Sequence, residues 1–249
     1  MTSTIKFIFV LATAFSVLAT PLQQDSSPDL VKRDDPPSLW GPDGPKKEDI
    51  WQGPHTDWLQ CGAAKLASMD EWDIRSRFSL NKDLGAKSRT RGKVELYHDT
   101  KFWQQRDVNF NVDMLKDNSV NTDADKHWWP AALEVAAGLI LDKKVDDKNI
   151  NAVVGLRLLT GRPAQTKKLE GDNEQVRAEL WNVLLAANKT PTCIWKSDRW
   201  MGVLSAKDVT ETEQGQITMY DTWDHKEVTE GIDAVYKATT YYSKLDAPL

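Results

Sequence analysis

The sequence is poor in residues that bind metals and lacks a membrane-length apolar run in its body. Its 249 residues include only two cysteines, Cys61 and Cys193, and four scattered histidines, with no C-x-x-C pair. This pattern predicts no metal site. After residue 20 no segment is long and apolar enough to span a bilayer. The formal net charge of −5 argues against nucleic acid or an anionic membrane surface as a partner.

The N-terminal residues predict secretion and processing. Lys6, an apolar run over residues 7–18 and the small residue Ala19 are typical of a signal peptide, which we assign to residues 1–19. The dibasic pair Lys32-Arg33 predicts a short pro-segment over residues 20–33 and a mature protein that begins near residue 34. We therefore expect an extracellular protein, whose two cysteines form one disulfide, Cys61–Cys193.

The organising stretch of the chain is a loop that leads into a helix, over residues 49–67. Before it, residues 34–48 are rich in proline, glycine and charge, which predicts a flexible arm. Leu59, Ala63 and Leu66 stand at i, i+4 and i+7 and form one apolar helix face. The N-terminus of such a helix suits a thiolate or an oxyanion because its N–H groups are unpaired.

Further elements follow in an order that favours an α+β fold. The sequence predicts a helix over residues 123–141, capped by Asp123 or Asp125, and another over residues 173–187. It predicts two short strands around residue 103 and later strands over residues 192–195, 200–206, 217–220 and 235–241. Helices first and strands later are typical of an α+β protein. Asn188 begins an N-x-T glycosylation pattern.

Four motifs in this order resemble the catalytic core of calpains, a family of papain-like cysteine proteases. They are Gln52-Gly53 with Asp57 four residues later, W-Q-Q-R-D-V-N-F-N-V-D at residues 103–113, W-W-P-A-A-L-E-V-A-A at 128–137, and Leu159-Thr160-Gly161. The resemblance implies the papain-like two-lobed fold. Its helical lobe would span residues 49–160 and its β-rich lobe residues 161–249, with a cleft between them.

The resemblance also locates the catalytic positions, and all three hold other residues. Trp58 stands at the nucleophile, Arg199 at the histidine and Asp221 at the asparagine, while Gln52 remains at the oxyanion position. A papain-like mechanism needs a thiolate and a base, and arginine stays protonated at any working pH. The resemblance therefore predicts a pseudoprotease that binds a protein or peptide in its former cleft, which retains Trp223.

Two other functions remain open at this point. Shifting the register by three residues makes Cys61 the nucleophile of an active endopeptidase, for which His225 is the available substitute base. Alternatively, Trp58 fills and closes the cleft, and the protein has a structural or interaction role. No cofactor is expected from the residues. Calpain cores bind calcium through acidic loops, so calcium is implied by the resemblance alone.

Overall fold

The computed structural model describes the chain in nine stretches, residues 38–50, 56–69, 74–79, 91–98, 103–109, 127–142, 150–171, 173–208 and 215–249. Every described residue belongs to one compact unit, residues 35–249. The predicted signal peptide and pro-segment, and the oxyanion residue Gln52, lie outside the described residues.

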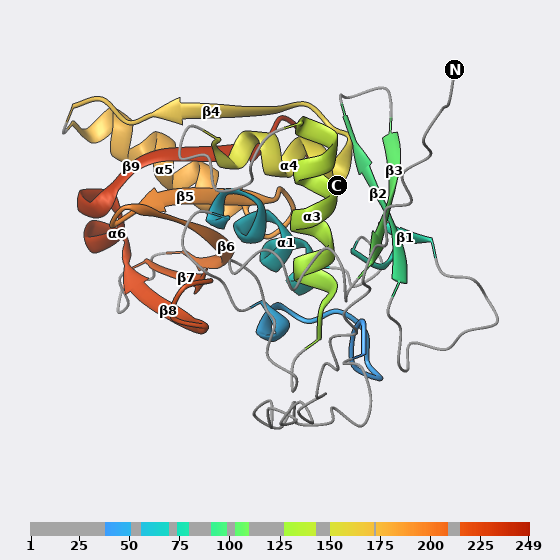
Figure 1. Cartoon of the computed structure of the whole chain (residues 1–249). Helices are drawn as coiled ribbons and strands as arrows, with labels where there is room; N and C mark the ends of the chain where they lie inside the picture. Colours follow the sequence, from blue (N-terminus) through green and yellow to red (C-terminus); the bar gives the residue numbers. More distant parts are fainter. Residues whose placement is uncertain are drawn as a thin grey trace, which may run out of the picture. The chain divides into compact units, whose positions relative to one another are not determined.

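The protein is α+β, as predicted. One part carries the 3₁₀ helix η1 (Lys47–Asp49) and the helices α1 (Asp57–Met69), α3 (Trp129–Leu141) and α4 (Ala152–Thr160). A small antiparallel sheet accompanies them in the order β1-β2-β3, formed by Phe78–Ser79, Arg91–Tyr97 and Trp103–Asn109. Figure 1 shows α3 beside this sheet.

The other part is an antiparallel sheet of six strands in the order β4-β9-β5-β6-β7-β8. In chain order, β4 to β9 span Ala164–Lys168, Thr192–Lys196, Arg199–Lys207, Gln216–Asp221, Lys226–Gly231 and Thr239–Leu245. The helices α5 (Glu174–Ala186) and α6 (Ile232–Ala238) accompany this sheet. Ser197 and Asp198 both have positive φ, 51° and 64°, as a type I′ hairpin turn requires, and this turn starts β6 at Arg199.

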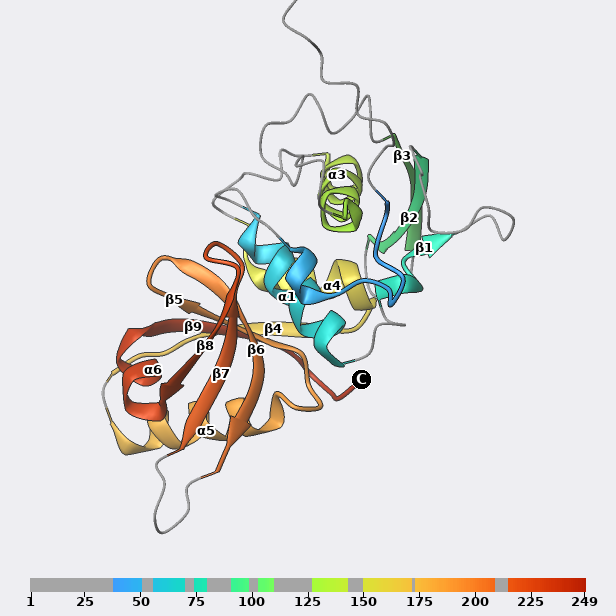
Figure 2. The same cartoon turned by 90° about the horizontal axis from the view of Figure 1, so that it is seen from below.

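The helix α1 lies between α3 and α4 on one side and the six-stranded sheet on the other (Figure 2). Two glycines permit this close packing. A Cβ atom on Gly155 of α4 would lie 2.3 Å from the carbonyl oxygen of Trp58, and one on Gly202 of β6 would lie 2.5 Å from that of Cys61. Any side chain at either position would therefore push α1 away from its neighbours.

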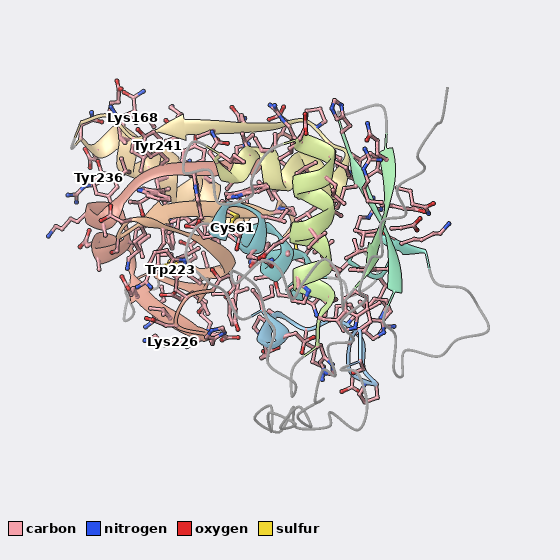
Figure 3. The ribbon with its side chains drawn as sticks, in the orientation of Figure 1. Cys61, Lys168, Trp223, Lys226, Tyr236 and Tyr241 are labelled. Atoms are coloured by element: carbon pink, nitrogen blue, oxygen red, sulfur yellow. A yellow bond between two sulfur atoms is a disulfide. The ribbon has the colours of Figure 1, made fainter. Side chains whose placement is uncertain are left out.

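The predicted disulfide between Cys61 and Cys193 is present (Figure 3). It joins α1 to β5 across a Cα–Cα distance of 6.0 Å, and both residues are fully buried. The pairing is consistent with an oxidising, extracellular environment. No helix in the described stretches has the length and apolar character needed to cross a membrane.

The prediction of a flexible arm over residues 34–48 was wrong for the part that the structure describes, residues 38–48. Leu39 is fully buried, and Trp40 is 6% exposed and packs edge-on against Phe78 at 5.3 Å between ring centroids. Backbone N–H groups of Trp128 and Trp129 donate to the carbonyl oxygens of residues 38 and 39. Proline and glycine indicate an irregular backbone, but the two large apolar side chains decide that it is packed.

Other expectations held only in part. The helix over residues 123–141 begins at Trp129 with Trp128 as its N-cap, whereas Asp123 and Asp125 lie outside the described residues. The helix after Asn173 is confirmed, and the Asn173 side chain accepts from the Val176 N–H at 3.0 Å. The strand predicted over residues 235–241 is confirmed only from residue 239, where β9 begins, because α6 continues to residue 238. The sequence analysis did not predict α4, β4 or β8.

Lys65 gives the fold a testable dependence on pH. It is 1% exposed, and its Nζ donates to the Leu204 carbonyl oxygen at 2.7 Å, where an irregularity interrupts the pairing of β6 with β7. Burial lowers the pKa of Lys65 to about 8. The unfolded chain, with a lysine pKa of about 10.4, therefore binds more protons between these values, so the free energy of unfolding should rise from pH 8 to about 10.

Lys65→Met should remove this rise. We expect urea unfolding at pH 7.5 and 9.5 to show a larger gain in stability for the wild type than for the variant. Lys168→Met, at a lysine whose side chain is 54% exposed, is the matched control and should keep the gain. An equal gain in the wild type and Lys65→Met would contradict the assignment.

Candidate functional site

The structure brings the N-terminus of α1 to the start of β6. The backbone N–H of Trp200 donates to Asp57 Oδ2 at 2.6 Å, across 143 residues of sequence. Trp58 is the second residue of α1, and Arg199 is the first residue of β6. In the same sheet Gly202 of β6 pairs with Tyr220 of β7. Because the two strands are antiparallel, this register places Arg199, at the start of β6, near the turn that follows β7.

Arg199 and Asp221 form an ion pair. Arg199 Nη2 lies 3.2 Å from Asp221 Oδ2 and 3.7 Å from Asp224 Oδ2, and its Cζ lies 5.4 Å from the centre of the Trp223 ring. Asp221 is 2% exposed, and its Oδ1 accepts from the N–H groups of Trp223 at 3.0 Å and Asp224 at 3.3 Å. One buried carboxylate thus neutralises Arg199 and shapes the β7–β8 turn.

This arrangement supplies neither the base nor the nucleophile of a cysteine protease. Arg199 has no lone pair that accepts a proton at working pH. Cys61 is fully buried and bonded to Cys193, so it offers no thiolate. His225, the substitute base, uses Nδ1 to donate to the Ile50 carbonyl oxygen at 2.8 Å. The structure does not bring the candidate nucleophile and base together.

Trp58 does not face solvent. Its side chain is 1% exposed and belongs to the core around α1, α3 and α4. Solvent reaches instead a surface that we call the Arg199 corner, formed by Arg199, Trp223, Asp224 and Lys226. Trp223 is 38% exposed, and Lys226 Nζ lies 3.3 Å from Asp224 Oδ2. Figure 3 labels Trp223 and Lys226 at the β7–β8 end of the sheet.

A buried polar cluster, which the sequence analysis did not identify, holds the N-terminus of α1 to α3. Glu134 Oε1 accepts from Thr56 Oγ1 at 2.8 Å and from Gln60 Nε2 at 2.5 Å, and Gln60 Nε2 also lies 3.2 Å from the Pro130 carbonyl oxygen. Glu134 is the glutamate of the Leu-Glu pair that contributed to the resemblance. That motif is the one sequence feature that marks Glu134, and it does not indicate what the side chain binds.

The segment around η1 connects both parts of the protein just before residues 51–55. Lys47 Nζ lies 3.1 Å from Glu227 of β8, and the Ile50 carbonyl accepts from His225. On the other side, Asp49 Oδ2 accepts from Trp129 Nε1 of α3 at 2.7 Å. Burial raises the pKa of Asp49 above its ordinary value, against the opposing effect of its hydrogen bonds. The loop that would carry Gln52 therefore starts from an anchored point.

Other polar groups lie elsewhere on the surface, among them Arg177, which stacks on Tyr236 and pairs with Asp233. An open hollow of about 460 Å³ lies along α5, β4 and β9, where Glu179 accepts from Lys167 and from Tyr242. Asn188 is exposed in the turn after α5, and its glycosylation stays a prediction. No group of three His, Cys, Asp or Glu side chains in the described stretches is placed to hold a metal ion. Calcium stays an implication of the resemblance.

Compared with known families and curated sequences, the chain matches neither a family model nor a curated protein.

Asp221→Asn tests how much the ion pair contributes to stability. The amide keeps an oxygen for the two backbone N–H groups of the turn but leaves Arg199 beside a neutral buried group. We expect a loss of about 1–3 kcal/mol in the free energy of unfolding, measured with urea. Asp233→Asn is the control, because Asp233 is 66% exposed and pairs with Arg177 at 3.5 Å. It should cost less than about 1 kcal/mol, and equal losses would contradict a structural role for the Arg199–Asp221 pair.

Proposed function

We propose that this protein is a secreted, calpain-like pseudoprotease, which binds a protein or peptide at its former active site and does not cleave it. The observation that carries the proposal is the Arg199–Asp221 ion pair. It stands where the resemblance requires a histidine and an asparagine, and it replaces a proton-transfer pair by a permanently charged one. The proposal includes the papain-like two-lobed fold, with residues 49–160 and 161–249 as its lobes.

The position of α1 supports that fold. In a papain-like protein the helix that carries the nucleophile lies where the helical and β-rich lobes meet. Here α1 packs on α4 and on β6, and its N-terminus is bonded to the start of β6 through Asp57. The disulfide, the Asp57–Trp200 bond and the bond from Lys65 to Leu204 tie α1 to the sheet at three points.

Binding without catalysis suits the composition of the Arg199 corner. Tryptophan and arginine are enriched among residues that dominate binding energy, because they offer large contact areas and several hydrogen-bond donors. Trp223 is one of the few large apolar side chains exposed in the described stretches. Asp221 holds its turn in one conformation, so a ligand pays little to order it. Gln52 and Trp58 complete the proposed site, Trp58 as packing beneath it.

The structure also supports a second candidate, a structural or interaction protein whose cleft is closed. The burial of Trp58 is the specific observation in its favour. The third alternative, an endopeptidase that uses Cys61, requires reduction of a fully buried disulfide and a base that the described residues do not place beside Cys61. These two alternatives differ from the pseudoprotease in measurable ways.

The absence of catalysis is tested by assays of the purified, unreduced protein. We expect no hydrolysis of unfolded protein or of fluorogenic peptides, with or without calcium, and no labelling by a thiol-directed epoxide. The reason is that a cysteine in a disulfide cannot form the acyl-enzyme. Cys61→Ala is the matched variant, and turnover that it abolishes would establish the endopeptidase instead.

Binding is tested with peptides from a digested unfolded protein, passed over the immobilised protein. We expect Trp223→Ala to reduce the retained peptide at least severalfold, because it removes the exposed ring of the Arg199 corner. Leu139→Ala is the matched control, since Leu139 is 52% exposed on α3, and it should bind as the wild type does. Retention by neither the wild type nor the control would favour the closed, structural alternative.

A further inference from the structure

Arg199 has more hydrogen-bond donors than its partners use. A guanidinium group carries five N–H bonds, on Nε, Nη1 and Nη2. Both of the neighbouring carboxylates, from Asp221 and Asp224, approach the same atom, Nη2. In the described part of the chain, Nη1 has no hydrogen-bond partner and Nε is buried without one. With its side chain 21% exposed, Arg199 presents unused donors at the surface.

The two carboxylates hold Arg199 to very different degrees. Asp221 is buried, lies closer and also binds two backbone N–H groups, so it cannot leave without unfolding the turn. Asp224 is 45% exposed, lies 3.7 Å from Arg199 and has a second cation, Lys226, at 3.3 Å. An exposed pair at such a distance contributes little to stability, and Lys226 retains Asp224 when it moves.

We propose that Arg199 binds a carboxylate of the ligand, that an apolar group next to this carboxylate packs on Trp223, and that Asp224 occupies the site in the free protein. This inference rests on the proposed function and names the class of peptide that it takes. The Nη1–Nη2 edge of a guanidinium matches the two oxygens of a carboxylate, and Asp224 now contacts only one of these nitrogens.

The unused donors of Arg199 and the adjoining Trp223 ring suit a ligand carboxylate that has an apolar group next to it. Asp221 already binds Arg199 and the backbone of the turn. When Asp224 moves away from Arg199 and pairs with Lys226 alone, the ligand supplies the acceptor for the unused guanidinium donors. Trp223 lies against the same guanidinium and keeps an exposed ring surface beside it. A peptide C-terminus after an aromatic residue, or an Asp or Glu side chain next to one, supplies this pair of groups.

The experiment uses three small probes with the full-length, unreduced protein. N-acetylphenylalanine carries a C-terminal carboxylate, N-acetylphenylalaninamide lacks it, and N-acetyl-aspartyl-phenylalaninamide carries a side-chain carboxylate instead. Binding is measured by NMR titration of the tryptophan indole N–H signals. We expect an acidic probe to bind about tenfold or more tightly than the neutral amide, because a charge-assisted hydrogen bond is lost in the latter. Comparing the two acids identifies which carboxylate source is preferred.

Variants test the roles of Asp224 and Arg199 separately. Asp224→Asn should tighten binding of the preferred acid about two- to fivefold, the range that loss of an exposed competing ion pair allows. The double variant Arg199→Met with Asp221→Asn should abolish it without leaving a buried unpaired charge. The chain offers matched controls, because Arg177 stacks on Tyr236 at 4.8 Å and pairs with Asp233. Asp233→Asn and Arg177→Met should leave binding unchanged.

The outcomes separate this inference from the proposed function. Equal binding of acid and amide would overturn the carboxylate site, and an unchanged affinity in Asp224→Asn would overturn the competing role of Asp224. No binding of any probe to the wild type or to Asp224→Asn would also overturn the inference. In each case, retention of digest peptides that depends on Trp223 would leave the pseudoprotease proposal standing, and its loss would overturn that proposal as well.

Discussion

The burial of α1 is the constraint on which the rest of the structure depends. Every residue from Asp57 to Leu66 is buried, so this helix has no solvent-facing side in its first three turns. A helix buried all round must find partners inside the protein for each polar side chain that it carries. Asp57 accepts a hydrogen bond from the Trp200 N–H. Gln60 donates to Glu134, and Lys65 donates to the Leu204 carbonyl oxygen. These partners come from α3 and β6, which fixes how the helices and the large sheet meet.

The same constraint shapes the candidate site. Because α1 is held by the disulfide and by three polar side chains, its N-terminus cannot move relative to β6 without breaking buried contacts. Trp58 adds a large ring to this core, where a catalytic residue would need access to a substrate. The chemistry left at the surface is that of Arg199, Trp223 and Asp224. In the proposed site these groups contact a ligand through charge and ring surface.

The Arg199–Asp221 ion pair depends on the structure around it. Arg199 needs a stable counter-charge, which Asp221 provides from a buried position. The hydrogen bonds from the turn to Asp221 then serve binding, since they keep Trp223 beside the guanidinium. The proposed pseudoprotease thus uses the rigidity of an enzyme site without its reactive groups.

The sequence by itself determined those features that depend on neighbouring residues, and the one disulfide, for which only two cysteines are present. Spacing of apolar residues marked α1, Asn173 marked the start of α5, and two cysteines allowed one intramolecular disulfide. In each case the information lies within a few residues of the element concerned, or in the count of a rare residue type.

Only the tertiary structure decided the features that depend on contacts between distant residues. Leu39 and Trp40 lie in a proline- and glycine-rich segment, yet the apolar surface near α3 and Phe78 buries them. Nothing in the sequence indicates what the Glu134 side chain binds, and only the fold shows that it accepts hydrogen bonds from Thr56 and Gln60. The distance of 3.7 Å between Arg199 and Asp224 likewise depends on the folded chain, as does the burial of Trp58. Burial and pairing of a side chain depend on what the folded chain brings next to it, and local sequence does not contain that information.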